Sequence, residues 1–259
     1  MKPGADEQNK TAALAPVYKV LGISVAAISW NEALALVAGF IERGEFLRVA
    51  WLNAHCGNTS CEDPRYREAL DHFLVLPDGL GVDLAALIRY GRKFPVNLNG
   101  TDFTPALIQH IKTPLRIGLI GAKPEVTEKA AAYFSALAPQ HEVRMISDGF
   151  FTKEEEGEVL EKLARFRPDM LLVALGVPRQ ELFILDKLTE RHCTAAFGVG
   201  ALFDLHSGAV RRAPLWVRRH RIEWLYRLWQ EPGRLWRRYI IGNFAFVLRV
   251  LRDRIRRGS

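Results

Sequence analysis

Short apolar runs alternate with amphipathic stretches along most of the chain. Helical spacing of apolar residues is found near 30–42, 63–71, 80–90, 102–112, 124–137, 153–166 and 179–190. The apolar runs predict strands at Tyr18–Ser24, Leu47–Leu52, Phe73–Leu76, Leu115–Ile120, Glu142–Ile146, Met170–Leu175 and Thr194–Val199. Such alternation predicts an α/β fold, in which helices cover both faces of a parallel sheet. Ligands of such sheets bind beyond the carboxyl ends of the strands.

The pattern changes near Ser207–Pro214. Helical spacing of Ile222, Leu225, Tyr226 and Trp229 ends at a break predicted at Pro232-Gly233. In the next predicted helix an apolar arc of roughly 100° comprises Trp236, Ile240, Phe244, Val247, Leu251 and Ile255. The opposite side carries Arg238, Arg249, Arg252 and Arg256. This pattern fits a helix packed on the core with a solvated basic face. It also fits an interfacial helix lying on anionic lipid.

Three segments follow from these patterns. Residues 1–16 are polar and Ala-rich and predict a disordered tail. Residues 17–207 carry the strand–helix series and form the expected core, and residues 208–259 form a basic, Trp-rich helical appendage. A chain of 259 residues is long enough for such a core with an appendage.

Charge separates the appendage from the rest of the chain. The net charge is +7, yet the stretch from Arg211 onward has fourteen arginines and three carboxylates, so it carries +11 and the remainder −4. Four of the six tryptophans also lie there. This composition predicts an anionic partner for the appendage: lipid headgroups, diphosphate or nucleic acid.

Two further features bear on compartment. The apolar runs are all shorter than the roughly 20 residues that cross a bilayer. The three cysteines have no CxxC spacing, which indicates a reducing compartment and no disulfide framework.

Asp78 is the leading candidate for catalysis. It lies in Leu76-Pro-Asp-Gly-Leu-Gly81, directly after the third predicted strand. A carboxylate there can act as a general base, accept a sugar hydroxyl or bind metal. Alternatively, it caps the helix that follows.

Three other turns follow predicted strands. Gly121–Glu125 lacks the GxGxxG and Walker patterns, so a dinucleotide-binding fingerprint is not supported, and a plain turn between strand and helix or a nucleotide-contacting turn fits this segment. Gln180, in Ala174–Glu181, can donate and accept hydrogen bonds at once, as sugar recognition requires. Asp204, at the end of Gly198–Asp204, is available to a ribose or sugar hydroxyl. Their common sheet edge predicts a cleft.

Two asparagine-rich turns complete the set. Asn53-Ala-His-Cys56 follows the second strand, and its His–Cys pair has no partner pair at ligand spacing, so no metal site is predicted. Asn97, Asn99 and Asp102 surround a glycine turn, where an Asx cap is the simplest interpretation.

In combination, these motifs resemble the WecG/TagA/CpsF glycosyltransferase family from about Tyr18 to about Arg238. The ordered set is more specific than any single member. It comprises Asn53-Ala, Pro77-Asp-Gly-x-Gly81, Asn-Gly-Thr-Asp102, Leu175-Gly-x-Pro-Arg-Gln-Glu181, Gly198-Val-Gly-Ala-x-Phe-Asp204, Arg211-Arg-Ala-Pro214, Glu223-Trp-Leu-Tyr-Arg-Leu228 and Glu231-Pro232 with Arg234.

The resemblance implies a Rossmann-like core and a basic appendage that closes the site at the membrane. It implies inverting, metal-independent transfer from a UDP-sugar to a sugar on undecaprenyl diphosphate, with no cofactor, at the cytoplasmic face of the bacterial inner membrane. Asp78 becomes the candidate base. The residues implied to bind substrate are Asn53, Asn99, Gln180 and Asp204 at the sugars, and Arg212, Arg227 and Arg234 at the diphosphates. One base and several arginines suffice for this chemistry.

The sequence departs from the family at two places. Trp51 stands where members often have a small or hydroxyl residue, which reshapes the sugar pocket. Val96-Asn-Leu-Asn-Gly100 resembles members of the xanthan and acetan type, which implies glucose transfer. N-acetylmannosaminyl transfer, as in teichoic-acid relatives, is the alternative. The oligomeric state is open.

Three other classes compete, and the missing GxGxxG pattern argues against the first, a Rossmann dehydrogenase. A nucleic-acid-binding protein could use the Arg/Trp appendage to follow phosphates and stack bases. That interpretation leaves the Asp78 and Gln180 turns unexplained, so nucleic acid is not the expected partner. A non-catalytic scaffold that recruits partners to the membrane is the third class.

Overall fold

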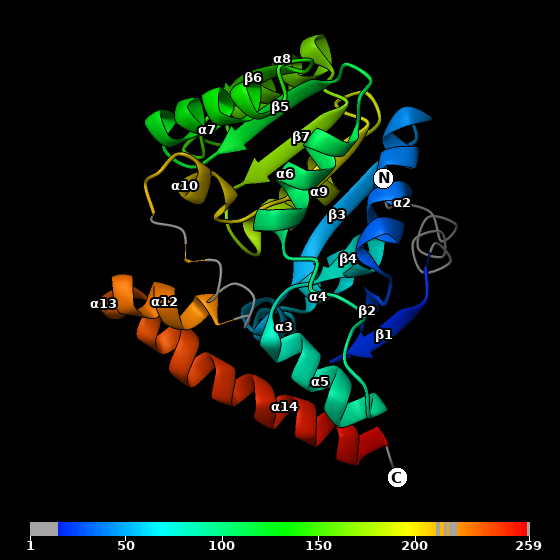
Figure 1. The fold of residues 1–259 in the computed structure, drawn as a ribbon. Coiled ribbons are helices and arrows are strands. Elements are labelled where there is room, and N and C mark those ends of the chain that lie inside the picture. Colours follow the sequence, from blue (N-terminus) through cyan, green and yellow to red (C-terminus); the bar gives the residue numbers. More distant parts are fainter. Residues whose placement is uncertain (1–14, 211–212, 215–216, 218–221, 258–259) are drawn as a thin grey trace.

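A six-stranded parallel sheet forms the centre of the molecule (Figure 1). The computed structural model describes residues 15–210, 213–214, 217 and 222–257, so the tail predicted over 1–16 lies outside them except for its last two residues. The strand order β4-β3-β8-β7-β5-β6 confirms the predicted α/β fold. The strands are β3 (Leu47–Leu52), β4 (Leu74–Pro77), β5 (Arg116–Gly121), β6 (Glu142–Ser147), β7 (Met170–Ala174) and β8 (Ala195–Gly198).

Helices cover both faces because successive strand residues point to opposite sides. In β3, Val49 and Trp51 join one apolar cluster, and Ala50 and Leu52 join the other. The first face is covered by α2 (Trp30–Glu42), α6 (Gly100–His110), α7 (Pro124–Leu137) and α10 (Leu202–His206). The second is covered by α3 (Ala54–Glu62), α4 (Pro64–Ala69), the 3-10 turn η1 (Leu70–His72), α5 (Leu80–Tyr90), α8 (Glu156–Phe166), α9 (Arg179–Lys187) and α14 (Gly242–Arg257).

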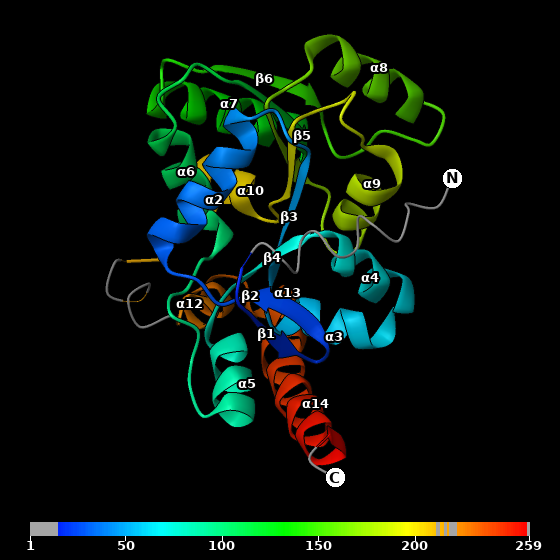
Figure 2. The same ribbon diagram turned by 90° about the vertical axis from the view of Figure 1, so that its right-hand side faces the viewer.

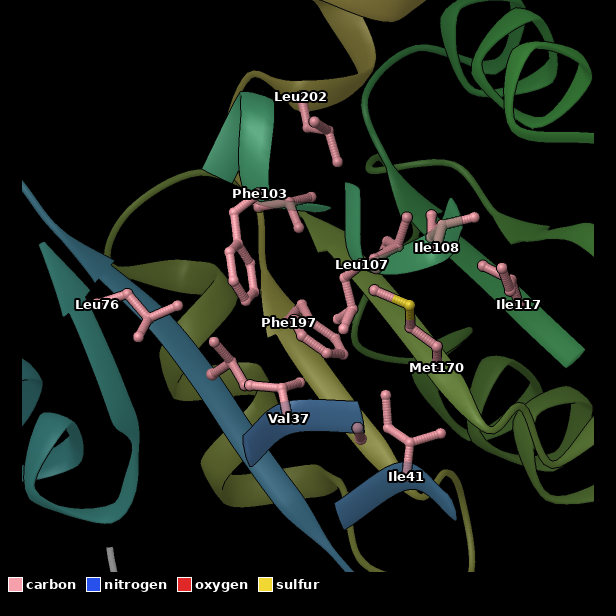
Figure 3. Close-up of a cluster of buried hydrophobic side chains, with 14 of the residues drawn as sticks. Val37, Ile41, Leu76, Phe103, Leu107, Ile108, Ile117, Met170, Phe197 and Leu202 are labelled. Carbon is pink, nitrogen blue, oxygen red and sulfur yellow. The ribbon is translucent and has the colours of Figure 1, made fainter. Parts of the chain in front are cut away.

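The core of the first face is dense. Figure 3 shows Val37 and Ile41 of α2 and Leu107 of α6 gathered around Phe197 of the central strand β8, and each is 5% exposed or less. This packing holds the carboxyl ends of β3, β7 and β8 in fixed relative positions. The turns that follow those strands are therefore supported on a rigid base.

The single strand predicted at Tyr18–Ser24 is wrong. The segment forms an antiparallel hairpin of β1 (Val17–Val20) and β2 (Ile23–Ala26), separate from the main sheet. Leu21 and Gly22 both have positive φ, at 50° and 82°. Two consecutive left-handed residues reverse the chain in a two-residue turn, which an apolar run by itself does not reveal.

The C-terminal segment contains α12 (Glu223–Gln230), α13 (Pro232–Trp236), the π-helical turn η2 (Arg237–Ile241) and α14. The predicted break occurs at Glu231, one residue early, and Pro232-Gly233 opens the next helix. Proline suits this first position because its missing N–H would have no partner there. The helical path then runs through η2 into α14.

The apolar arc predicted for the last helix does not pack on the core. Trp236, Ile240, Phe244, Leu251 and Ile255 are all exposed, and Phe246 and Val250 are buried against the second face instead. The predicted solvated basic face is also wrong at Arg249. Its guanidinium donates to the Asn58 carbonyl at 2.9 Å and to Glu62 Oε1 at 2.7 Å, both on α3.

The physical reason lies on the body. Gly57 of α3 and Gly81 of α5 leave a slot for the Phe246 ring, and a Cβ at Gly57 would lie 2.5 Å from that ring. The slot lies opposite Phe246, so the side of the helix that carries Phe246 and Val250 packs inward and the predicted arc turns outward. No helix among the described residues is long and apolar enough to span a bilayer.

Candidate active site

The predicted cleft is present at the carboxyl edge of the sheet. A cavity of about 600 Å³ is lined by the turns after β3, β4, β5, β7 and β8 and by Gly149 and Phe150 after β6. Gly121 and Gly198 allow the turns to approach closely. A Cβ at Gly121 would overlap the Ala174 backbone, and one at Gly198 would lie 3.0 Å from Gln180 Nε2.

A second cavity, of about 330 Å³, lies between the sheet edge and the C-terminal helices. Leu80 and Leu84 of α5 and Phe246 and Val247 of α14 give it apolar walls. Both cavities share part of their lining, which consists of Asn53, His55, Asp78, Gly100, Thr101, Arg227, Arg238 and Tyr239. The two cavities therefore meet at Asp78.

The Asp78 turn is held by backbone and side-chain hydrogen bonds. The Asp78 amide donates to the Leu52 carbonyl at 2.9 Å, and the Gly79 amide donates to Asn97 Oδ1 at 2.8 Å. Gly79 has φ 91° and is the N-cap of α5, and no side chain caps that helix. The capping interpretation of Asp78 is wrong, since its carboxylate lines the two cavities instead.

Opposing effects act on the Asp78 carboxyl. Burial raises its pKa above the ordinary value, and Asp102 adds to this. A hydrogen bond from Asn53 Nδ2 to Asp78 Oδ2, at 3.2 Å, lowers the pKa, as do the positive charges of Arg227 and Arg238. Removing water from a carboxylate by burial makes it a stronger proton acceptor than a carboxylate in water.

Asn53 and Asn99 both begin helices. Asn53 Oδ1 accepts from the Cys56 amide at 3.1 Å and caps α3, which directs its Nδ2 to Asp78. Asn99 caps α6, where its Oδ1 accepts from the Asp102 amide at 3.0 Å, and its side chain lines the second cavity. Both asparagines thus shape the loops that carry the site.

Gln180 lies beneath the first cavity and is only 2% exposed. Its Oε1 accepts from the Gly200 amide at 3.1 Å, and its Nε2 donates to Glu181 Oε1 at 2.8 Å. Burial raises the pKa of Glu181 to about 8, so this acid is neutral in the folded protein below that pH. The Gln180–Glu181 pair therefore fixes the turn after β8 from below.

The other predicted residues divide into two groups. Asp204, on α10, lines the first cavity, and Arg227, on α12, lines both. The buried Nε of Arg227 has no hydrogen-bond acceptor among the described residues. Arg212 and the side chain of Arg234 lie outside what the structure describes.

The sequence interpretation missed several lining residues. Arg238 and Tyr239 enter both cavities from η2, and Lys123 and Arg179 line the first cavity at the starts of α7 and α9. No spacing signal marks the η2 residues, because a π-helical turn shifts the helix phase. Lys123 and Arg179 each follow a strand-end glycine turn, which was an available signal.

His55 is also part of the shared lining. Burial and the nearby Arg238 charge lower its pKa to about 4, so the imidazole is neutral at physiological pH. A neutral imidazole can donate or accept a hydrogen bond beside Asp78. Within the described part of the chain, no group of three or more His, Cys, Asp or Glu side chains could hold a metal ion.

Comparison with known proteins shows which family the chain resembles. Residues 18–259 match the glycosyl transferase WecG/TagA/CpsF family. An N-acetylglucosaminyldiphosphoundecaprenol N-acetyl-beta-D-mannosaminyltransferase of Bacillus spizizenii is 34% identical over 200 residues, 76% of each chain. The protein of the same name from Bacillus subtilis (strain 168) is 33% identical over 207 residues, 79% of each chain.

Proposed function

The chain belongs to the WecG/TagA/CpsF family of glycosyltransferases, and we propose that it moves a sugar from a UDP-sugar to a sugar on undecaprenyl diphosphate. The meeting of two cavities at Asp78 carries this proposal, because the acceptor hydroxyl must lie within reach of both the base and the anomeric carbon of the donor.

The first cavity is the proposed donor site. The N-terminal ends of α7 and α9 border it, and Lys123 and Arg179 line it. Helix N-termini and basic side chains attract a diphosphate. Asp204 is the proposed partner of a ribose or sugar hydroxyl, and Gln180 supports the turn around the donor sugar.

The second cavity is the proposed acceptor site. Its polar end at Asn53, Asn99 and Asp78 suits a sugar, and its apolar walls from α5 and α14 suit the lipid side of the acceptor. Sugar rings also present apolar faces, so mixed walls serve both parts of this substrate.

In the proposed step Asp78 removes the proton from the acceptor hydroxyl. The hydroxyl oxygen bonds to the anomeric carbon from the face opposite UDP, and the bond between that carbon and the diphosphate oxygen breaks. This inverts the anomeric centre, and UDP leaves with the bonding electrons. Arg227 and Arg238, which line the first cavity, are proposed to stabilise its negative charge.

Arg212 and Arg234 are proposed to add to the diphosphate site. Transfer without a metal is proposed because arginines can supply the charge that a metal would otherwise supply.

N-acetylmannosamine is the donor sugar favoured by the activity of the two Bacillus relatives. Glucose, which the Val96–Gly100 motif implies, is the second candidate. The position of the Trp51 side chain favours glucose as the donor sugar. Its indole lines the first cavity over Gly100, where a Cβ would approach within 3.1 Å, and its N–H donates to the Leu98 carbonyl at 2.6 Å. A fixed indole leaves little room for an acetamido group.

A donor and acceptor panel tests the proposal. The purified protein is given UDP-glucose, UDP-N-acetylglucosamine and UDP-N-acetylmannosamine with lipid-diphosphate-linked glucose or N-acetylglucosamine, and products are identified by mass and anomeric configuration. We expect one preferred donor and an inverted product. A retained configuration refutes the mechanism, and the absence of product from every pair refutes the function. Trp51→Thr should raise the relative rate with acetamido donors if glucose is native.

We also propose that the protein acts peripherally at the cytoplasmic face of the inner membrane. The acceptor that the relatives' names specify is carried by a membrane lipid. The outward apolar side chains of α14 and its arginines suit contact with anionic lipid. A reducing compartment is also compatible with the cysteines, since Cys56, Cys61 and Cys193 are all free.

A further inference from the structure

Exposed large apolar side chains gather on two parts of the molecule. Among the described residues, α5 carries four of them, residues 225–255 carry nine, and one, Phe150, lies elsewhere. Concentration of this kind marks an interaction surface, whereas scattered exposed apolar residues are ordinary. The residues are Leu80, Leu84, Leu87, Tyr90, Leu225, Trp229, Trp236, Ile240, Ile241, Phe244, Leu248, Leu251 and Ile255.

Helix α5 has two apolar faces. Val82, Ala85 and Ala86 pack in the second core cluster. Leu80, Leu84 and Leu87 follow i, i+4, i+7 spacing and point outward, with 36–42% of their surface exposed. The inward face already holds the helix on the sheet, so the outward leucines are not explained by folding.

Helix α14 repeats this arrangement beside α5. Phe246 and Val250 pack inward, while Phe244 and Ile255 are 68% and 70% exposed. Figures 1 and 2 both show the two helices side by side along the lower end of the molecule. Arg89 Nη1 of α5 donates to Asp253 Oδ2 of α14 at 3.0 Å, which ties the two together.

The charges on these two helices favour an anionic lipid surface. Asp83 and Asp253 are the only carboxylates in residues 80–90 and 242–257. Asp83 is 3% exposed, and Asp253 is paired with Arg89. Arg252, Arg254 and Arg256 are exposed. Outward apolar residues flanked by arginines suit the boundary between headgroups and acyl chains.

The second cavity connects this surface to the reacting groups. It is lined by Leu80 and Leu84 of α5 and by Phe246 and Val247 of α14, and its far side includes Asp78. An acceptor with a sugar at one end and a lipid at the other could thus reach Asp78 while its chain stays in the bilayer.

We propose that α5 and α14 together form the face that lies on the bilayer, and that the lipid-linked acceptor enters the second cavity between them. Membrane binding is then a property of the core as well as of the C-terminal segment. The identity of the acceptor rests on the proposed function. The assignment of α5 and α14 to the membrane face does not depend on the proposed function.

Two neutral substitutions test the face without touching either cavity. Leu87→Gln on α5 and Leu251→Gln on α14 each remove an exposed leucine outside both cavity linings. Ala136→Gln, at an exposed position of α7, is the matched control. Binding of the full chain to phosphatidylglycerol/phosphatidylcholine vesicles is measured by cosedimentation, together with the thermal midpoint and the sedimentation coefficient.

We expect each leucine variant to bind vesicles roughly tenfold more weakly, with an unchanged midpoint and with the control unaffected. Transfer to a short-chain, water-soluble acceptor should stay within about twofold, because no bilayer contact is needed there. Transfer to the full-length lipid in vesicles should fall with binding.

Three results would overturn the proposal: no vesicle binding by the unsubstituted protein, weaker binding for Leu251→Gln but not for Leu87→Gln, or a loss of oligomers in place of vesicle binding. The last result would assign the face to a second copy of the chain. If vesicle binding follows the expected pattern but no donor–acceptor pair gives product, only the proposed function fails.

Discussion

The carboxyl edge of the sheet and the outer face of α14 arrange polar and apolar side chains in opposite ways. At the sheet edge, apolar residues such as Leu52 and Phe197 are buried and the polar turns face the cavities. On α14, Phe244 and Ile255 face outward and Arg249 bonds inward to α3. The first arrangement follows from folding alone, whereas the second is the one for which we propose a membrane partner. Substitutions should therefore separate activity, stability and membrane binding.

Asp78→Asn, at the sheet edge, should have the largest effect of all the substitutions, and the effect should be on turnover. Removing the base should lower turnover by about 10²–10⁴, while asparagine can still accept the hydrogen bond from Asn53. Turnover, UDP affinity and thermal midpoint are measured together, and Asp186→Asn on exposed α9 surface is the control. Near-normal turnover would remove Asp78 from the mechanism, whereas an absence of turnover in the unsubstituted protein would favour the scaffold interpretation.

Substitutions of two phenylalanines of α14, one buried and one exposed, compare folding with membrane binding within a single helix. Phe246→Ala should destabilise the protein by about 3–5 kcal/mol, because it empties the slot at Gly57 and Gly81. Phe244→Ala should change stability by less than about 0.5 kcal/mol and should weaken vesicle binding. Chemical denaturation of both variants measures this. Equal destabilisation would mean that the outward face also contributes to folding.

Glu181 should make stability depend on pH. Burial raises its pKa from 4.5 to about 8, so between these values the folded protein keeps a proton that the unfolded chain releases. This contribution to stability is complete below pH 4.5 and is lost as pH rises toward 8, by at most about 1.4 kcal/mol per unit. Glu181→Gln, which can still accept from Gln180, should flatten the fall in melting temperature between pH 5 and pH 8. Glu161→Gln, at an exposed site on α8, should not. An unchanged slope in Glu181→Gln would refute this account.

Removing divalent metal ions with EDTA should have the smallest effect on the transfer rate. If Arg227 and Arg238 meet the charge of the leaving diphosphate, transfer rates in EDTA, magnesium and manganese should agree within about twofold. A complete loss of activity in EDTA that magnesium or manganese restores would contradict this prediction.

The sequence by itself determined the class of the fold and much of the site. Strand–helix alternation predicted the parallel sheet, because buried strands need continuous apolar runs. Strand-end turns predicted where Asp78, Gln180 and Asp204 would gather, since the carboxyl ends of parallel strands share one edge. The motif order identified the family. These features depend on residues close together in the chain.

Tertiary structure decided what depends on contacts between distant segments. The 18–24 run became a hairpin because Leu21-Gly22 adopted left-handed φ values. Helix α14 turned its predicted packing arc outward, because glycines more than 160 residues away, at 57 and 81, accept Phe246 instead. Arg238 and Tyr239, in the π-helical turn η2, line the same cavities as Asp78, although they lie about 160 residues further along the chain. Amphipathicity shows that a helix has two sides, but only the surface it meets decides which side is buried.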